Sequence, residues 1–120
     1  MIKTYNMKQE YTYWLALANA ENIYTRRKNE ILAKIHEDNS SLAHFFTEEN
    51  NWKNRFNLSQ DEIQSLLQEK EKLNNYSFIV EDLLEQGYQI IPIFSSDYPK
   101  TLKKNLKFSS PILLYAYGNI

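Results

Sequence analysis

Cysteine is absent from this sequence of 120 residues, and glycine occurs only twice. A chain without cysteine can form neither a disulfide framework nor a thiolate metal site. Scarce glycine argues against a loop that cradles phosphate, because such a loop brings backbone N–H groups close to the ligand and leaves no room for a Cβ. The sequence therefore points away from disulfide-stabilised proteins, zinc–thiolate proteins and phosphate-loop proteins.

Long apolar runs and paired histidines are missing as well. No apolar run is longer than the six residues of 112–117, far short of a membrane span, and the first residues lack the apolar stretch of a signal peptide. His36 and His44 are the only histidines, and neither has a second histidine one helical turn away. We expect a cytoplasmic protein with no membrane partner, no metal and no cofactor.

Catalytic patterns are not apparent either. The serines near the C-terminus border prolines or turns, and none lies in a G-x-S-x-G elbow. Acidic pairs such as Glu48-Glu49 and Glu81-Asp82 lie in helical stretches, where carboxylates usually face solvent. We expect that this protein is not an enzyme.

Apolar and aromatic side chains are plentiful: 42% of the residues are hydrophobic, including nine Tyr, six Phe and two Trp. This content is enough for a packed core. Apolar residues recur at helical spacing through residues 7–86, whereas short β-branched and alternating runs follow Gly87. The pattern predicts a mainly helical α+β chain, with a helical bundle that leads into a strand, a helix and a second strand.

Polar breaks divide the helical pattern into several predicted helices. Three predicted helices cover residues 7–18, residues 25–37 and residues 59–72. Between the last two lie a short helix that contains Leu42, Phe45 and Phe46 and a turn in which Trp52 and Phe56 face inward. The last predicted helix has an apolar stripe of Tyr76, Ile79, Val80, Leu83 and Leu84. Asn39-Ser40-Ser41 offers an N-cap for the short helix, and Ser59 with Glu62 fits a capping box. Gly87 fits the left-handed position that ends the last helix.

The C-terminal segment has a different pattern. Residues 88–94 are short, apolar and β-branched, and Pro92 places this predicted strand at a sheet edge because proline cannot donate to a ladder. Pro99 is allowed in the first turn of a helix, so residues 98–106 are expected to form a short helix that buries Leu102 and Leu106. Residues 112–117 form the second predicted strand.

Basic residues gather at two places that could contact nucleic acid. Residues 1–87 carry 10 basic and 14 acidic side chains, whereas residues 88–120 carry four lysines and one aspartate. The four are Lys100, Lys103, Lys104 and Lys107. Near them lie Tyr98, Phe108, Tyr115 and Tyr117, and basic side chains beside aromatic rings are typical of single-strand binding. The simpler alternative is that the rings fill the core while the lysines face water.

The second place is Arg26-Arg27-Lys28, at the start of the predicted helix over residues 25–37. Three cations at a helix N-terminus oppose the helix dipole and are locally unfavourable. This favours a functional role for them, such as contact with phosphate. A helix start that simply faces solvent explains the same residues.

Two motifs in the C-terminal segment resemble a known family. After a helix that ends in glycine and a strand, Asp97, Tyr98, Pro99 and Leu102 fit Asp-x-x-Tyr-Pro-x-x-Leu or a close form, with Asp directly before Tyr. Pro111, Leu114, Tyr115, Gly118 and Asn119 fit Pro-Pro-x-x-Leu-Tyr-x-x-Gly-Asn, with Ser110 in place of the first proline. These motifs are similar to those of the bacterial DNA-processing family DprA, also called Smf. The matched residues are expected to be structural.

The resemblance implies a fold and a function. It implies a helical domain like a sterile alpha motif (SAM) over residues 1–86, followed by the first strand-helix-strand of an extended Rossmann-like domain over residues 87–120. It also implies binding of single-stranded DNA and loading of the RecA recombinase in natural transformation. The family's principal DNA-binding loop would follow Ile120, so this chain would correspond to the N-terminal part. The family's glycine-bearing hairpin near the start is replaced by residues 18–24, which contain no glycine.

A second interpretation is a stand-alone module that binds another protein. Its helical face or exposed strand edges would pair with a partner or with another copy of the chain, because unpaired apolar strands invite β-addition and self-association.

Overall fold

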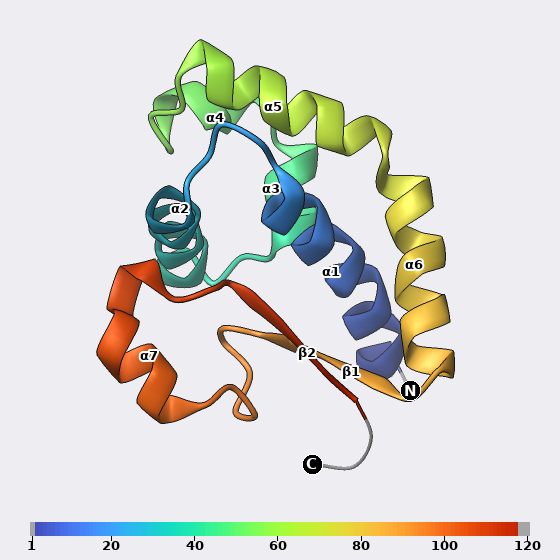
Figure 1. The fold of residues 1–120 in the computed structure, drawn as a ribbon. Helices are drawn as coiled ribbons and strands as arrows, with labels where there is room; N and C mark the ends of the chain where they lie inside the picture. The colour runs from blue at the N-terminus through green and yellow to red at the C-terminus, as the bar shows by residue number, and fades with distance from the viewer. Residues whose placement is uncertain (1, 118–120) are drawn as a thin grey trace.

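The fold is mainly helical with one small sheet (Figure 1). The structure, a computed structural model, describes the backbone of residues 2–117 and the side chains of residues 8–117. The helices are α1 (Ile2–Asn19), α2 (Thr25–Glu37), α3 (Leu42–Thr47), α4 (Asn50–Asn54), α5 (Gln60–Glu71), α6 (Leu73–Glu85) and α7 (Lys100–Leu106), with a 3-10 turn η1 (Lys107–Ser109) after α7. The strands are β1 (Tyr88–Pro92) and β2 (Leu113–Tyr117). The predicted mainly helical α+β class is confirmed.

Local capping fixes the starts of α3 and α5. The Ser41 hydroxyl accepts the His44 N–H at 3.1 Å, and Ser59 and Glu62 form the predicted capping box with both of its hydrogen bonds. The start of α3 is also held from α1, because the carboxylate of Glu10 accepts the N–H of Leu42 at 2.7 Å. The first N–H groups of a helix have no hydrogen-bond acceptor within that helix. The Glu10 carboxylate is the acceptor at the start of α3, and it thereby joins α1 to α3.

An aromatic cluster fills the space enclosed by α1, α3 and α4. Phe45, Phe46, Trp52 and Phe56 are all buried, as their spacing predicted. The Phe45 ring lies 5.5 Å from that of Trp52 and 4.9 Å from that of Phe56. The Trp52 Nε1–H donates to the backbone oxygen of Phe45 at 2.9 Å, so its polar atom is also satisfied.

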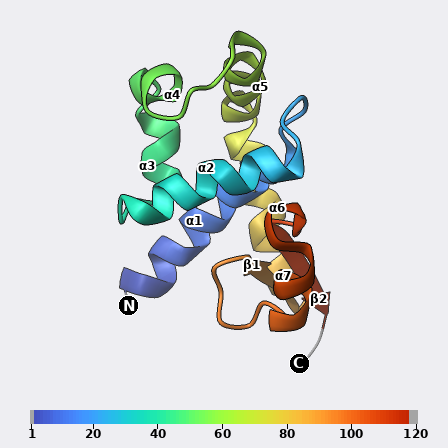
Figure 2. The same ribbon diagram turned by 90° about the vertical axis from the view of Figure 1, so that its left-hand side faces the viewer.

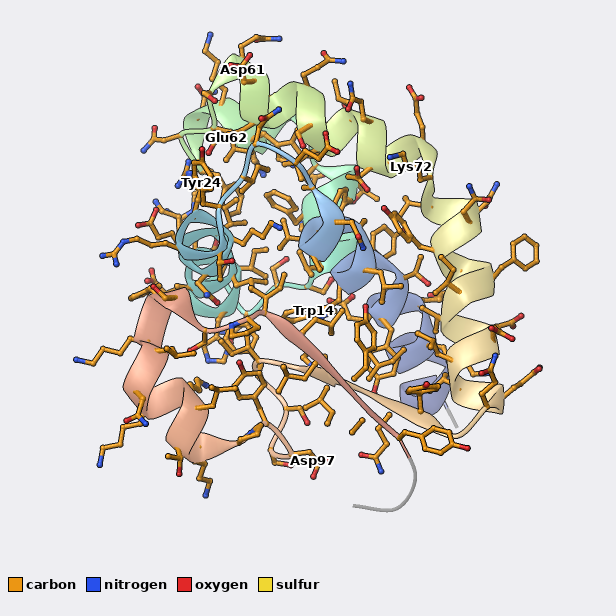
Figure 3. All side chains as sticks on the ribbon, viewed as in Figure 1. Trp14, Tyr24, Asp61, Glu62, Lys72 and Asp97 are labelled. Atoms are coloured by element: carbon orange, nitrogen blue, oxygen red, sulfur yellow. The ribbon has the colours of Figure 1, made fainter. Side chains whose placement is uncertain are left out.

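The junction of α5 and α6 contains a buried carboxylate. Glu69 is 3% exposed and accepts a hydrogen bond from the Tyr76 hydroxyl, while Lys72 Nζ lies 3.5 Å from its other oxygen. Lys72 is at the corner where α5 turns into α6 (Figure 3). Burial, with the hydrogen bond to Glu69, raises the pKa of Tyr76 well above its ordinary value. The hydroxyl therefore stays protonated and continues to donate.

The apolar stripe predicted on α6 is narrower in the structure. Tyr76 and Val80 are buried, but Ile79 is 44% exposed. The helix packs on α1 and β1 along one side, and Ile79 lies at the margin of that side. Leu83 and Leu84 are half-buried, so the predicted stripe faces the core at every position except Ile79. As predicted, Gly87 ends the segment with a φ of +92°.

The two strands form an antiparallel sheet. Tyr88 pairs with Tyr117 and Pro92 with Leu113, and the Ile93 N–H continues the ladder to the Ile112 oxygen at 2.9 Å. Pro92 thus lies at the end of an edge strand, where its missing N–H costs no ladder bond. The predicted helix between the strands is confirmed. Because the two strands pair antiparallel, this helix does not form the crossover that joins two parallel strands.

Helix α7 lies at the rim of the molecule (Figure 2). Leu102 is half-buried, whereas Leu106 is 41% exposed. The expectation that both leucines are buried was therefore wrong for Leu106. The helix has only seven residues and packs chiefly against η1, so just one flank of it reaches the core.

One hydrophobic core runs through both parts of the chain. It includes Leu17, Ile31 and Phe46 of the helices together with Ile90 and Ile112 of the C-terminal segment. Trp14 lies near the centre of Figure 3, above the two strands. The C-terminal segment is thus packed on α1, α2 and α6, while a domain boundary at residues 86 and 87 stays a prediction.

Candidate nucleic-acid interface

Arg27, the middle cation of the triplet in α2, is used inside the fold. Its Nε donates to Glu62 Oε2 at 3.1 Å, and its Nη2 donates to the backbone oxygens of Phe56 and Asn57 at 2.8 and 3.0 Å. Glu62 extends from α5 toward the start of α2 (Figure 3). Arg27 therefore joins α2 to the loop before α5, and these hydrogen bonds within the fold occupy its guanidinium.

Lys28 is also engaged. Its Nζ donates to the Ala18 oxygen at 2.7 Å, in the last turn of α1. Burial lowers the pKa of Lys28, and the nearby carboxylate of Glu69 opposes that shift. Only Arg26 of the triplet extends into solvent: its side chain is 71% exposed, and its Nε lies 3.8 Å from Glu30 Oε2. Arg26 is thus the exposed cation of the triplet, whereas Arg27 and Lys28 bind groups within the fold.

Asn29, the next residue, fastens the C-terminal segment to α2. It is 6% exposed, and its Nδ2 donates to the backbone oxygens of Phe108 and Ser110 at 2.9 and 2.8 Å. Nearby, the buried Tyr98 hydroxyl donates to the Pro111 oxygen at 2.7 Å. These bonds place η1 beside α2, although about eighty residues separate them in the sequence.

This arrangement creates an open groove of about 310 Å³ between α2, the end of β1, α7 and η1. Its lining residues are Asn29, Ala33, Ile93, Phe94, Lys103, Lys107 and Phe108, and we call it the aromatic–basic groove. Phe94 and Phe108 are 43% and 44% exposed. Both rings line one groove, and exposed apolar side chains that gather in one place indicate a binding surface, whereas single exposed rings do not.

Cations lie directly at these rings. The Arg26 guanidinium carbon is 5.9 Å from the centre of the Phe108 ring, and Lys103 Nζ is 5.8 Å from the centre of the Phe94 ring. Both distances are within the range of a cation–π interaction. Phe94 is supported from within the fold by His36 at 4.9 Å and by Trp14 at 5.9 Å between ring centres. The groove therefore has an apolar floor and a basic rim.

The structure brings together some of the predicted nucleic-acid residues and not others. Arg26, Lys103 and Lys107 surround the groove, whereas Lys100 and Lys104 are exposed on α7 without lining it. Tyr98, one of the rings considered for base stacking, is buried, and burial raises the pKa of its hydroxyl. The alternative that aromatic rings fill the core is correct for Tyr98.

Phe94 and Asn29 are site residues that were not predicted from the sequence. Phe94 was assigned to the strand, but β1 ends at Pro92, and the Ser95 N–H closes a turn onto the Pro92 oxygen at 2.8 Å. That turn directs Phe94 toward α2. The Ser-Ser-Asp run that follows Phe94 was the available signal for an early end of the strand.

Some of the family-signature residues within the described part of the chain have structural surroundings, and others are exposed. Pro99 stands directly before α7, Leu102 and Leu114 are half-buried, and Tyr98 is bonded to the Pro111 oxygen. Asp97 and Tyr115 are exposed, and Asp97 points away from the core at the loop before α7 (Figure 3). Gly118 and Asn119 lie outside the described residues.

A larger hollow of about 740 Å³ lies at the ends of α2, α3 and α4. Two of its charged side chains form an ion pair: Arg55 Nη2 is 2.6 Å from Asp38 Oδ1, and this hydrogen bond lowers the pKa of the Asp38 carboxyl. His44 also borders it. We find no grouping of a nucleophile, a base and an oxyanion donor here.

Within residues 2–117, no three His, Cys, Asp or Glu side chains stand where they could share a metal ion. In the same part of the chain, no helix is both long and apolar enough to cross a membrane. Comparison of the chain with protein-family models, with curated proteins and with solved structures found no match.

Proposed function

We propose that this chain binds single-stranded DNA through the aromatic–basic groove. The observation that carries the proposal is the meeting of Arg26 from α2 with Lys103 and Lys107 from the C-terminal segment around Phe94 and Phe108. Single-strand sites combine cations that follow the backbone with rings on which bases stack. The groove contains both, contributed by elements far apart in the sequence.

The chemistry of the groove favours an unpaired strand. A base in a duplex cannot turn its face toward a protein ring, whereas an unpaired base can replace the cation now above Phe108 or Phe94. Stacking of this kind contributes about 1–3 kcal/mol per base and tolerates any base, because every base has a π-face. The displaced cations then contact the neighbouring phosphates, which makes the affinity depend on salt.

The resemblance of the two C-terminal motifs supports assigning this activity to a DNA-processing protein of the DprA kind. In this proposal the chain corresponds to the N-terminal part of such a protein, with a SAM-like bundle and the start of a Rossmann-like domain. Its role would be in natural transformation, where the whole protein holds the single strand and loads RecA. The groove would add a contact to the one that the rest of the protein provides.

Fluorescence anisotropy with a labelled oligothymidine tests the proposal. We expect Lys103→Glu combined with Lys107→Glu to weaken binding about tenfold or more at low salt, because two phosphate contacts become repulsions. The matched control is Lys8→Glu with Lys53→Glu, two exposed lysines outside the groove that give the same change in net charge. An equal loss in both double variants would mean that binding follows net charge alone and would refute the groove.

Phe108→Ser tests the stacking part separately. It should weaken binding about five- to a hundredfold, the range that one stacked base supplies, while leaving the dependence on salt unchanged. An unlabelled duplex of the same length should compete less well than the single strand. Equal competition by the duplex would contradict a site built for unpaired bases.

A further inference from the structure

The outer side of α6 carries an exposed aromatic ring among acidic side chains. Phe78 is 71% exposed, and Glu81, Asp82 and Glu85 follow it at spacings of three, four and seven residues. These spacings place all four side chains on one side of the helix, opposite the buried Tyr76 and Val80. We call these four residues the acidic face.

The acidic face has no basic residue near it in the sequence. Residues 73–99 contain no lysine or arginine, so the carboxylates of the acidic face have no neutralising partner on α6 or in the strand that follows. A solvated helix surface usually mixes both signs of charge and leaves large aromatics out. An exposed ring surrounded by carboxylates instead indicates a contact surface whose partner is basic and has an apolar hollow.

The aromatic–basic groove offers that combination. Its floor is formed by Phe94, Phe108, Ile93 and Ala33, and its rim carries Lys103 and Lys107. A phenyl ring fits an apolar floor of this kind with edge or offset stacking on the existing rings. The carboxylates one turn further along α6 would then lie over the lysines at the rim.

The two surfaces lie on opposite sides of the molecule. In Figure 1, α6 stands on the right and α7 on the left, and in Figure 2 α7 is in front with α6 behind the core. Helix α6 packs on α1, α5 and β1, which keeps its acidic face turned away from the groove of the same molecule. The chain cannot join these surfaces within one copy.

We propose that the acidic face of one copy docks in the aromatic–basic groove of a second copy. The occupant follows from charge complementarity, since acidic carboxylates around one ring meet a basic rim around an apolar floor. The contact joins two different surfaces, so each added copy leaves one free groove and one free acidic face. Association therefore continues beyond a dimer as the protein concentration rises.

Docking of the acidic face would compete with DNA for the aromatic–basic groove. Phe78 and an unpaired base need the same rings, and the carboxylates need the same lysines as the phosphates. Self-association and single-strand binding are therefore mutually exclusive at one groove. Adding oligothymidine should dissociate the assembly, and added salt should weaken it because exposed charges are screened.

Sedimentation equilibrium over a series of protein concentrations, without DNA, tests the contact. We expect Phe78→Ser to lower the association constant about tenfold or more, as loss of an aromatic anchor does. Lys103→Glu with Lys107→Glu should have a similar effect. Tyr24→Ser, which removes an exposed ring at the start of α2, should leave association unchanged.

Mixing the two defective variants gives the decisive result. The Phe78→Ser copy keeps an intact groove, and the lysine double variant keeps an intact acidic face, so an equimolar mixture should form a one-to-one dimer and nothing larger. Circular dichroism on each variant shows whether it is folded. A wild-type chain that stays monomeric at millimolar concentration, or a mixture of folded variants that stays monomeric, would overturn the inference.

The result is distinguishable from a failure of the DNA proposal. Phe78 is outside the groove, so in dilute solution Phe78→Ser should bind oligothymidine as tightly as the wild type. If DNA binds but no copies associate, only the self-association inference falls. If copies associate through the groove but no DNA binds, the proposed function falls and this inference stands.

Discussion

Trp52→Ala is expected to lower the free energy of unfolding by about 3–5 kcal/mol, the range for deleting a large buried aromatic ring. Trp52 is 1% exposed, and its ring lies 5.5 Å from that of Phe45 and 6.2 Å from that of Phe46. Truncation would open a cavity in this cluster and remove the Nε1–H that the Phe45 oxygen accepts. Since a small domain is stable by about 5–15 kcal/mol, the loss would remove a large part of the free energy of unfolding.

Urea unfolding followed by circular dichroism measures this loss. Trp52→Phe is the informative comparison, because it keeps most of the ring contacts and removes only the donor and part of the volume. It should cost about 1–2 kcal/mol, well below the alanine variant. Tyr24→Ala, at an exposed aromatic, should change stability by less than about 0.5 kcal/mol. Equal losses in the alanine and phenylalanine variants would show that the ring is not a packing centre.

Sequence reasoning succeeded where the cause lies within a few residues. The predicted bounds of α2 agree with the structure at both ends, and the capping box at Ser59 and Glu62 forms with both bonds. Gly87 adopts the positive φ expected after a helix. In each case the side chain and the backbone group that it satisfies are neighbours in the chain, so the pattern itself contains the interaction.

Prediction from the sequence failed where a side chain bonds to a residue far away in the sequence. Arg27 pairs with Glu62, thirty-five residues on, and Glu10 meets the start of α3 more than thirty residues on. From the sequence, Arg27 and Arg26 are equivalent cations at a helix start. Only the position of Glu62 and of the loop before α5, next to Arg27, makes Arg27 structural and leaves Arg26 at the groove.

The groove could be predicted only in part for the same reason. Its lysines were identified, because a local excess of one charge is visible in any sequence. The position of Phe94 was not, since it depends on the strand ending at Pro92 and on η1 lying against α2. That second condition depends on Asn29, whose isolated position in α2 carries no sequence signal.

Asn29→Asp is the second change with a large expected effect. The side chain is 6% exposed, and its amide donates to the backbone oxygens of Phe108 and Ser110. A carboxylate of the same shape has no hydrogen to donate, so it would face two carbonyl oxygens in a site with little water. Losing both bonds and burying an unpaired charge should lower the free energy of unfolding by about 3 kcal/mol at neutral pH.

The pH dependence identifies the cause of this loss. Burial without a donor raises the pKa of the introduced carboxyl above its unfolded value of about 3.9. The folded state therefore disfavours the charged carboxylate. The loss in free energy of unfolding is full above the pKa of the folded state and declines as pH falls through that pKa. Once protonated, the carboxyl can donate one hydrogen bond again. Relative to the wild type, Asn29→Asp should therefore recover stability as the solution is acidified.

Chemical denaturation of wild type and variant at a series of pH values measures this recovery. Asn75→Asp, at an exposed position of α6, adds the same charge and should change stability by less than about 0.5 kcal/mol at every pH. Because Asn29 holds Phe108 at the groove, Asn29→Asp should also weaken oligothymidine binding under conditions where the bundle is still folded. A variant that loses stability without any recovery in acid would show that the loss does not come from burying a charged carboxylate. Unchanged DNA binding in a folded Asn29→Asp protein would show that the groove does not depend on the link between α2 and η1.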